Sequence, residues 1–251
     1  MAKHKFMSIQ ITKNHKTAIL FGASGLVGRH CLDFLLASST YDKVLVFVRR
    51  KLKIEHDKLV QQVIDFDKLE TYENLIAGDD LFCCLGTTMK KAGSKEAFKR
   101  VDYTYTHQIA EIGAKNKVNQ FLLVSSVGAD KDSLFFYNQV KGELEAEVKL
   151  MPYWAVYIFQ PSLLLGDRNE NRWGESIAQR IGGLLDKVTG GLLQKYQPVE
   201  ADVVAKAMVS AAQQVEKGVH VYPSHVLQKL SRIENDKIDS RRDDFPKDTT
   251  Y

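Results

Sequence analysis

The feature that most constrains the fold of this chain is a repeated alternation between short apolar runs and amphipathic segments. Apolar runs rich in β-branched and aromatic residues cover 17–22, 43–50, 60–66, 80–88, 120–128 and 153–166. Segments with helical spacing of apolar residues lie at 26–38, 95–116 and 137–150. Continuous apolar strands that alternate with helices are typical of a parallel sheet covered on both faces. The sequence therefore predicts an α/β fold with a Rossmann-type doubly wound parallel sheet.

One domain accounts for most of the 251 residues, because neither an internal repeat nor a Gly/Ser-rich linker divides them. Residues 1–15 are expected to form an extension or an edge strand, and the domain itself to span 16–230. A small region at 166–200 is expected to cover the substrate, with an irregular cap or a subunit interface as the alternative. The last segment, 231–251, is rich in mixed charges and is expected to be a disordered polar tail.

Composition narrows the class of protein. The net charge of +4 comes from 35 basic and 31 acidic residues, a near balance that gives no support for nucleic-acid binding. No apolar stretch is long enough to span a bilayer, no secretory signal is visible, and the seven histidines lack a metal-ligand pattern. Three cysteines are expected to be free thiols. These features predict a cytoplasmic protein without a metal, with a small-molecule substrate and with homodimer formation left open.

Three glycines form a GxxGxxG turn between the first strand and the first helix, at Gly22, Gly25 and Gly28. Gly22 permits the tight turn, Gly25 lets the backbone approach a pyrophosphate, and Gly28 lets the helix pack close to the sheet. The helix N-terminus adds free N–H groups and a partial positive charge. The other residues of the turn expected to contact the cofactor are Ser24, Leu26 and Val27. The turn predicts dinucleotide binding, with turn geometry and close packing alone as the alternative.

The residues that follow the second strand favour one dinucleotide over the other. An NAD-preferring site places Asp or Glu at the end of this strand, where the carboxylate accepts from the ribose 2′-hydroxyl. Asp42 precedes the strand and should lie at the opposite edge, whereas Arg49 and Arg50 stand at the correct end. Guanidinium groups pair with phosphate, so NADP(H) is favoured over NAD(H). A solvated arginine is the alternative interpretation.

Residues after the third and fourth strands complete the expected cofactor site. Asp65 closes the third strand and is expected either to accept from the adenine amino group or to cap a helix. Gly86 and Thr87 follow the fourth strand, where the backbone would pass beside the ribose and pyrophosphate. A structural turn is the alternative for these two residues.

The segment after the fifth strand carries the candidate catalytic residues. The strand ends at Ser125 and Ser126, and Tyr137 and Lys141 follow at a spacing of four, which places both on one face of a helix. We expect Ser126, Tyr137 and Lys141 to converge where a nicotinamide ring would lie. Tyr137 would act as general acid or base, and the Lys141 ammonium would favour the phenolate. Ser126 would orient the substrate oxygen, with Ser125 as the alternative hydroxyl.

Several longer stretches support a family resemblance. They are CCLGTT (83–88), KAGS (91–94), RVDYTY (100–105), LLVSSVGADKDS (122–133), YNQVKGELEAEV (137–148) and GDRNENRWGE (166–175). Together with the glycine turn and the YxxxK pair, they resemble the short-chain dehydrogenase/reductase superfamily. More narrowly, they are similar to the atypical group that contains the mammalian Tat-interacting oxidoreductase-like protein, over about residues 16–225.

The resemblance implies a Rossmann fold, NADP(H) binding and a Ser/Tyr/Lys catalytic set. It carries these roles onto Gly22, Gly25, Gly28, Arg49, Ser126, Tyr137 and Lys141. One departure is Gln160-Pro161 after the sixth strand, where many relatives have Arg-Pro. The family does not specify a substrate.

Three functions are compatible with these residues. The leading hypothesis is an NADP(H)-dependent oxidoreductase that acts on a small carbonyl or alcohol. The first alternative is a non-catalytic NADP(H) sensor whose occupancy regulates a protein partner. The second is an epimerase or dehydratase that uses the nicotinamide transiently. Tyr137 and Lys141 favour an enzyme, because a sensor has no need of them.

Overall fold

The structure is a computed structural model that describes residues 15–165, 198–214 and 216–233. Within these ranges, seven strands form one parallel sheet in the order β3-β2-β1-β4-β5-β6-β9. The strands are β1 (Lys16–Phe21), β2 (Tyr41–Val48), β3 (Leu59–Val63), β4 (Asp80–Cys83), β5 (Gln120–Val124), β6 (Ala155–Gln160) and β9 (Gly218–Pro223). Strand order reverses between β1 and β4, as in a Rossmann fold. The predicted doubly wound α/β fold is confirmed.

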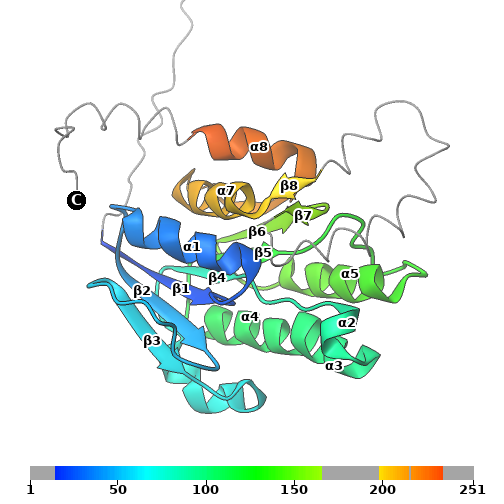
Figure 1. The fold of residues 1–251 in the computed structure, drawn as a ribbon, viewed down its shortest axis with the longest axis horizontal. Coiled ribbons are helices and arrows are strands. Elements are labelled where there is room, and N and C mark those ends of the chain that lie inside the picture. Colours follow the sequence, from blue (N-terminus) through cyan, green and yellow to red (C-terminus); the bar gives the residue numbers. More distant parts are fainter. Residues whose placement is uncertain (1–14, 166–197, 215, 234–251) are drawn as a thin grey trace, which may run out of the picture.

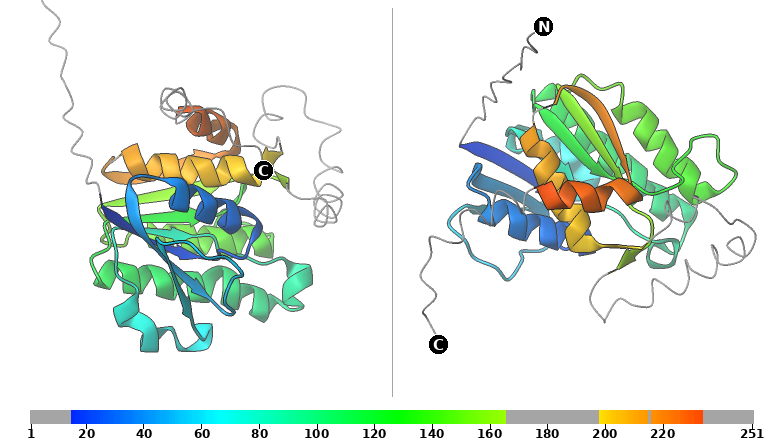
Figure 2. Two further views of the ribbon diagram at one scale, coloured as in Figure 1. Left: turned by 60° about the vertical axis from the view of Figure 1, so that its left-hand side comes forward. Right: turned by 90° about the horizontal axis from the view of Figure 1, so that it is seen from above.

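Helices cover both faces of the sheet (Figures 1 and 2). The helices on one face are α1 (Leu26–Ala37), α7 (Ala201–Gln214) and α8 (Ser224–Ile233). The main helices on the other face are η1 (Phe66–Leu75), α4 (Thr106–Lys115) and α5 (Phe136–Val148). The short elements α2 (Met89–Ala92), α3 (Lys95–Lys99) and the π-helical turn η2 (Arg100–Tyr105) precede α4. A separate two-stranded sheet joins β7 (Leu164–Leu165) to β8 (Val199–Glu200).

The apolar runs are continuous because both faces of each central strand are buried. On β1, Ala18 and Leu20 belong to the core cluster under α1 and α7. Ile19 and Phe21, which alternate with them, belong to the cluster under α4 and α5. Successive side chains of a strand point to opposite faces, so a strand between two helical layers needs apolar residues at every position.

Among the strands that are shorter than the sequence predicted, β4 and β5 bear on the candidate site. The run at 80–88 forms a strand only over Asp80–Cys83, and the run at 120–128 only over Gln120–Val124. In each case the remaining residues leave the sheet at its carboxyl edge as a loop. These two loops carry the candidate cofactor and catalytic residues that follow β4 and β5.

The carboxyl-terminal part of the domain contains elements that the sequence analysis did not identify. Helix α7 and strand β9 add a buried helix and an edge strand. Helix α8 ends at Ile233, so it includes the first three residues of the expected polar tail at 231–251. Nearly all of the expected extension at 1–15, most of the expected cap at 166–200 and the rest of that tail lie outside the described residues.

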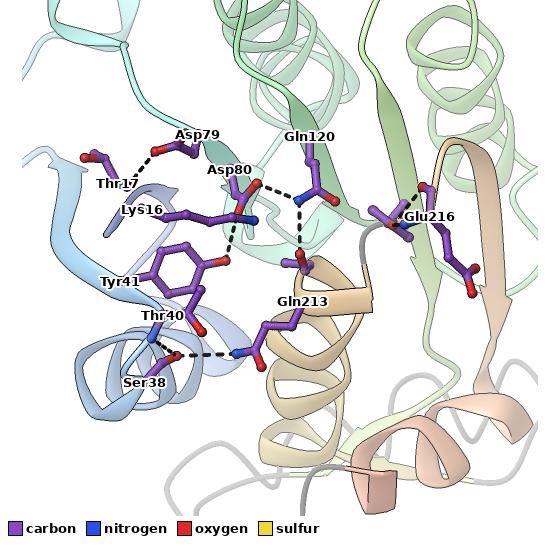
Figure 3. Close-up of polar contacts among 12 residues, drawn as sticks. Lys16, Thr17, Ser38, Thr40, Tyr41, Asp79, Asp80, Gln120, Gln213 and Glu216 are labelled. Atoms are coloured by element: carbon purple, nitrogen blue, oxygen red, sulfur yellow. Dashed lines mark hydrogen bonds and ion pairs between the residues drawn. The ribbon is translucent and has the colours of Figure 1, made fainter. Parts of the chain in front are cut away.

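A buried polar network holds the amino edge of the sheet together (Figure 3). The carboxylate of Asp80 is fully buried, and it pairs with the Lys16 ammonium at 3.1 Å and accepts from the Tyr41 hydroxyl at 2.7 Å. Gln120 Nε2 donates to Asp80 at 2.7 Å and to the carbonyl of Ala212 at 3.0 Å. Burial raises the pKa of Asp80, although Lys16 and the hydrogen bonds oppose the rise. The network joins four strands to α7 at the edge opposite the candidate site.

Candidate functional site

The glycine turn has the geometry that the sequence predicted. Gly22 directly follows β1 with φ +84°, and a Cβ there would lie 2.5 Å from the carbonyl oxygen of Cys84. A Cβ on Gly28 would lie only 2.0 Å from the carbonyl oxygen of Gly22. The N–H of Gly25 closes the turn by donating to the Gly22 carbonyl at 2.9 Å. Side chains are excluded at Gly22 and Gly28, so the turn and the first residues of α1 lie in contact.

The N-terminus of α1 presents uncapped backbone N–H groups. Gly25 is the N-cap residue, no side chain of the described residues caps the helix, and the first turn holds no acidic residue. Ser24 is exposed at this turn, and Leu26 and Val27 begin the helix. A helix N-terminus without a side-chain cap, reached through a turn without Cβ atoms, fits the pyrophosphate of a dinucleotide.

Residues at the ends of β2 and β3 occupy the expected places. Arg49 and Arg50 follow β2 at the carboxyl edge, and both are exposed. Asp42 lies near the start of β2, at the opposite edge. Asp65 is the N-cap of η1, where its side chain accepts from the N–H of Asp67 at 3.0 Å. Helix capping, one of the two roles anticipated for Asp65, is therefore what the structure shows.

Helix α5 carries Tyr137 and Lys141 one turn apart, and it brings Lys141 to the loop after β4. Lys141 has only 5% of its side chain exposed, whereas Tyr137 is 36% exposed. Lys141 Nζ lies 2.7 Å from Asp102 Oδ1, and Asp102 Oδ2 accepts from the N–H of Thr87 at 2.8 Å. A Cβ on Gly86 would lie 3.9 Å from Lys141 Nζ. Three predicted site residues, Gly86, Thr87 and Lys141, thus meet around one carboxylate.

The ammonium of Lys141 stays charged in this buried position. Burial lowers the pKa of Lys141, but the Asp102 carboxylate and the Tyr137 phenol together raise it by more, so the pKa lies above its ordinary value. Tyr137 and Lys141 are four residues apart on α5, so both side chains leave the same face of this helix.

The two serines after β5 differ in their surroundings. Ser125 is buried, and its hydroxyl donates to Glu145 Oε1 at 2.6 Å. Ser126 is partly exposed, and its hydroxyl makes a longer contact of 3.3 Å with the carbonyl of Val127. Because Glu145 already engages Ser125, Ser126 is the hydroxyl better placed to receive a substrate oxygen.

The loop that carries Ser126 is held against α5. A Cβ on Gly142 would overlap the backbone of Asp130 and Lys131, so only glycine allows this close approach. The N–H of Asp130 also donates to the carbonyl of Asn138 at 3.0 Å. These contacts fix the loop relative to the helix that bears Tyr137.

Sequence reasoning missed Asp102, Gly142 and Glu145. Each lies in a stretch with helical periodicity, where a charged residue is expected to be solvated and a glycine only to weaken the helix. Glu145 also accepts a hydrogen bond from Gln160 Nε2 at 2.9 Å. Gln160, which stands where many relatives have arginine, therefore donates to a buried carboxylate. The quoted segments RVDYTY and YNQVKGELEAEV contain all three missed residues, and this is the signal that could have identified them.

The described residues add neither a membrane span nor a metal site to this picture. Across the described ranges, no helix combines the length and apolarity needed to cross a bilayer. The same residues hold no cluster of three or more His, Cys, Asp or Glu side chains suited to a metal ion. The three cysteines, two buried and one partly buried, are free.

Comparison with curated proteins finds relatives across most of the chain. Protein HTATIP2 of Rattus norvegicus is 42% identical over 175 residues, which cover 68% of this chain and 72% of the relative. The mitochondrial protein fmp52 of Aspergillus niger is 33% identical over 76% of this chain and 85% of its own length. FMP52 of Candida glabrata, also named mitochondrial, is 30% identical over 88% of this chain and 98% of its own length.

These names correct one expectation. The cytoplasmic location expected from the sequence is wrong, because the fungal relatives are named mitochondrial proteins. The expectation rested on the missing secretory signal, and this criterion does not separate the cytoplasm from an organelle reached by another route.

Solved structures share the fold at low sequence identity. A UDP-N-acetylglucosamine 4-epimerase from Methanobrevibacter ruminantium has a TM-score of 0.63 at 14% identity, over 90% of this chain and 83% of that one. MoeE5 in complex with UDP-glucose and NAD has a TM-score of 0.62 at 16% identity, over 82% of this chain and 74% of that one. At such identity the likeness is one of fold.

A family model described as NAD(P)H-binding matches residues 22–151, from the glycine turn past the end of α5. The matched range contains the glycine turn, both arginines after β2, and Asp102, Ser126, Tyr137 and Lys141. The chain therefore belongs to the NAD(P)H-binding family and, within it, to the atypical short-chain dehydrogenase/reductase-like group of HTATIP2 and FMP52 proteins.

Proposed function

We propose that this chain is an NADP(H)-dependent oxidoreductase that transfers hydride to or from a small carbonyl or alcohol. One observation carries the proposal: a partly exposed tyrosine lies one helical turn from a buried, charged lysine at the carboxyl edge of a dinucleotide-binding sheet. A dinucleotide-binding protein without chemistry has no need to bury an ammonium at this place, since burial of a charge costs free energy.

Different residues of the chain would bind the cofactor, hold the substrate oxygen and transfer the proton. The glycine turn and the N-terminus of α1 would hold the pyrophosphate, and Arg49 and Arg50 would pair with the 2′-phosphate of NADP(H). The nicotinamide supplies or accepts the hydride when the cofactor is bound. Tyr137 would give a proton to the substrate oxygen or remove one from it, and Ser126 would hold that oxygen by a hydrogen bond. Lys141 would stabilise the negative charge that the phenol acquires after giving up its proton.

The preference for NADP(H) rests on charge. Arg49 and Arg50 are exposed at the carboxyl end of β2, and the only acidic residue of that strand, Asp42, lies near its opposite end. Two guanidinium groups gain little from a ribose hydroxyl and much from a phosphate dianion. We expect the two arginines to make the difference in affinity between the two cofactors.

Turnover of a carbonyl panel tests the proposal. NADPH consumption would be followed by its absorbance with aliphatic, aromatic and cyclic aldehydes and ketones. With any substrate that reacts, Tyr137→Phe should lower kcat by about 10²- to 10⁴-fold, the usual contribution of a general acid or base. Tyr153→Phe, which removes a hydroxyl that donates to the Ala110 carbonyl at 2.6 Å near the amino edge of the sheet, is the matched control and should leave kcat unchanged.

The outcomes separate the three hypotheses. Net consumption of NADPH that depends on Tyr137 supports the oxidoreductase. Tight NADPH binding without any reaction across the panel supports a cofactor-occupied regulator and contradicts the oxidoreductase. Substrate conversion without net consumption of NADPH supports an epimerase or dehydratase.

A further inference from the structure

A single carboxylate lies buried behind the candidate Tyr/Lys pair. Asp102 is 1% exposed, and it belongs to η2, the π-helical turn between α3 and α4. A π-helical turn inserts an extra residue into a helix, and such turns are frequent at functional sites. Asp102 is the residue of this turn that is buried. The π-helical turn therefore places the carboxylate of Asp102 in the interior of the protein.

The two oxygens of Asp102 serve two elements of the site. Oδ1 lies 2.7 Å from Lys141 Nζ, and Oδ2 accepts from the N–H of Thr87 at 2.8 Å. Gly86 lies beside both partners, since a Cβ there would be 3.5 Å from Asp102 Oδ1 and 3.9 Å from Lys141 Nζ. The loop after β4 and the catalytic face of α5 are thus tied to the same side chain.

The pair formed by Asp102 and Lys141 is electrically neutral as a unit. Both side chains are at least 95% buried, so little water screens either charge from its neighbours. An unpaired Lys141 would present a full positive charge to the phenol of Tyr137 and favour the phenolate strongly. With Asp102 beside it, much of that field is cancelled.

Other charged or titratable groups lie on β4, α3 and α5, the elements next to this pair, and they do not contact the Lys141 ammonium as Asp102 does. They are the Cys83 thiol on β4, Lys95 and Lys99 on α3, and Glu143 on α5, which pairs with Lys99. Lys95 lies over the ring of Phe136, and Lys99 is neutralised by Glu143 at 2.9 Å. Among these groups, Asp102 is the one in direct contact with the Lys141 ammonium.

We propose that Asp102 is a positioning residue that holds Lys141 in place and offsets the positive charge that Lys141 presents to the phenol of Tyr137. A phenol that keeps its proton can give it to a carbonyl oxygen, so this arrangement favours carbonyl reduction. In that direction the carbonyl carbon would gain a hydride, which the reduced cofactor would supply when bound, and the carbonyl oxygen would take the phenol proton. The products would be an alcohol, the oxidised cofactor and a phenolate, which would regain its proton from water. This inference rests on the proposed oxidoreductase function for the direction of the reaction. The effect of Asp102 on the charge that the Tyr137 phenol experiences does not depend on that function.

The titration of the Tyr137 phenol, followed by NMR of protein labelled with ¹³Cζ-tyrosine, tests the electrostatic part without any substrate. The resonance of Tyr137 is identified by its absence in Tyr137→Phe. Asp102→Asn should lower the titration midpoint by roughly one pH unit or more, because it leaves a cation unpaired near the phenol. Lys141→Met should raise the midpoint by a similar amount, because it leaves an anion unpaired. The double variant Asp102→Asn/Lys141→Met should return close to the wild type.

Shifts of opposite sign distinguish charge compensation from a merely structural ion pair, whose loss would move both single variants in the same way. If Asp102→Asn does not fold, the other two variants still decide: a double variant with a midpoint as high as that of Lys141→Met overturns the proposal. Unchanged midpoints in the single variants overturn it as well. A carbonyl panel without turnover would remove the oxidoreductase function, while the NMR titration would still report whether Asp102 sets the ionisation of Tyr137.

Discussion

Replacement of Gly28 by alanine tests how closely α1 must approach the glycine turn. The new Cβ would lie 2.0 Å from the Gly22 carbonyl oxygen, where ordinary contact begins near 3.4 Å. The turn and the helix must therefore separate by roughly 1.4 Å, and neither neighbour is a flexible side chain. Overpacking of this kind costs about 1–3 kcal/mol, and an alanine at a compatible backbone position returns about 0.5 kcal/mol. Because the clash is with backbone, we expect a net loss of about 2 kcal/mol.

The same displacement should weaken dinucleotide binding far more than it weakens the fold. The uncapped N–H groups of α1 would move away from the pyrophosphate, and each charge-assisted hydrogen bond contributes about 1.5–3 kcal/mol. Loss of two such bonds lowers the affinity about 100-fold or more. Urea denaturation measures the first effect, and calorimetric titration with NADPH measures the second.

Gly78→Ala is the matched control, because it introduces the same methyl group at the amino edge of the sheet. Its Cβ would lie 2.9 Å from the Thr17 carbonyl oxygen, away from the candidate site. This variant should lose stability but keep its NADPH affinity within about twofold, as expected for sites that do not interact. Equal loss of affinity in both variants, or an unchanged affinity in Gly28→Ala, would refute the assignment of the turn to the pyrophosphate.

Three further predictions address other parts of the molecule. Lys16→Met should destabilise the fold by about 3–5 kcal/mol in urea denaturation, because it leaves the fully buried Asp80 without its cation; no loss beyond about 1 kcal/mol would contradict the role of that network. The double variant Arg49→Ala/Arg50→Ala should weaken NADPH binding by at least about tenfold and leave NADH binding unchanged; equal losses would contradict selection by phosphate. The pKa of Lys141 is raised in the fold, so its ion pair should stabilise the protein equally from about pH 7 to about pH 10 and lose that contribution as the pH rises further. Thermal melts of the wild type and Lys141→Met from about pH 7 upward check the sign, which is wrong if their difference in stability does not shrink above about pH 10.

The first half of the site could be predicted because its signals are local. A buried strand, a glycine turn and a helix follow one another within 22 residues, and the structure places β1 and α1 within one residue of their predicted ends. Arg49 and Arg50 could be placed at the correct edge because strands in a parallel sheet share their direction. Tyr137 and Lys141 could be placed on one helical face because both lie within one continuous helix, α5.

The remaining features depend on contacts between segments that are distant in sequence. Asp102 lies buried within a π-helical turn, whereas a charge in a stretch with helical spacing predicts an exposed position. Strand β9 was missed because an edge strand with partly exposed residues lacks the apolar run of a central strand. The amino-edge network joins Lys16, Asp80 and Gln120 from three strands, and no spacing in the sequence announces that association.

Calorimetric titration of the purified chain with NADPH and NADH tests the central claim most directly. The glycine turn, the N-terminus of α1 and the arginines after β2 predict saturable binding of NADPH, at least about tenfold tighter than that of NADH because of the added phosphate contacts. An absence of binding heat with both cofactors, reduced and oxidised and at two temperatures, would contradict the account of this site.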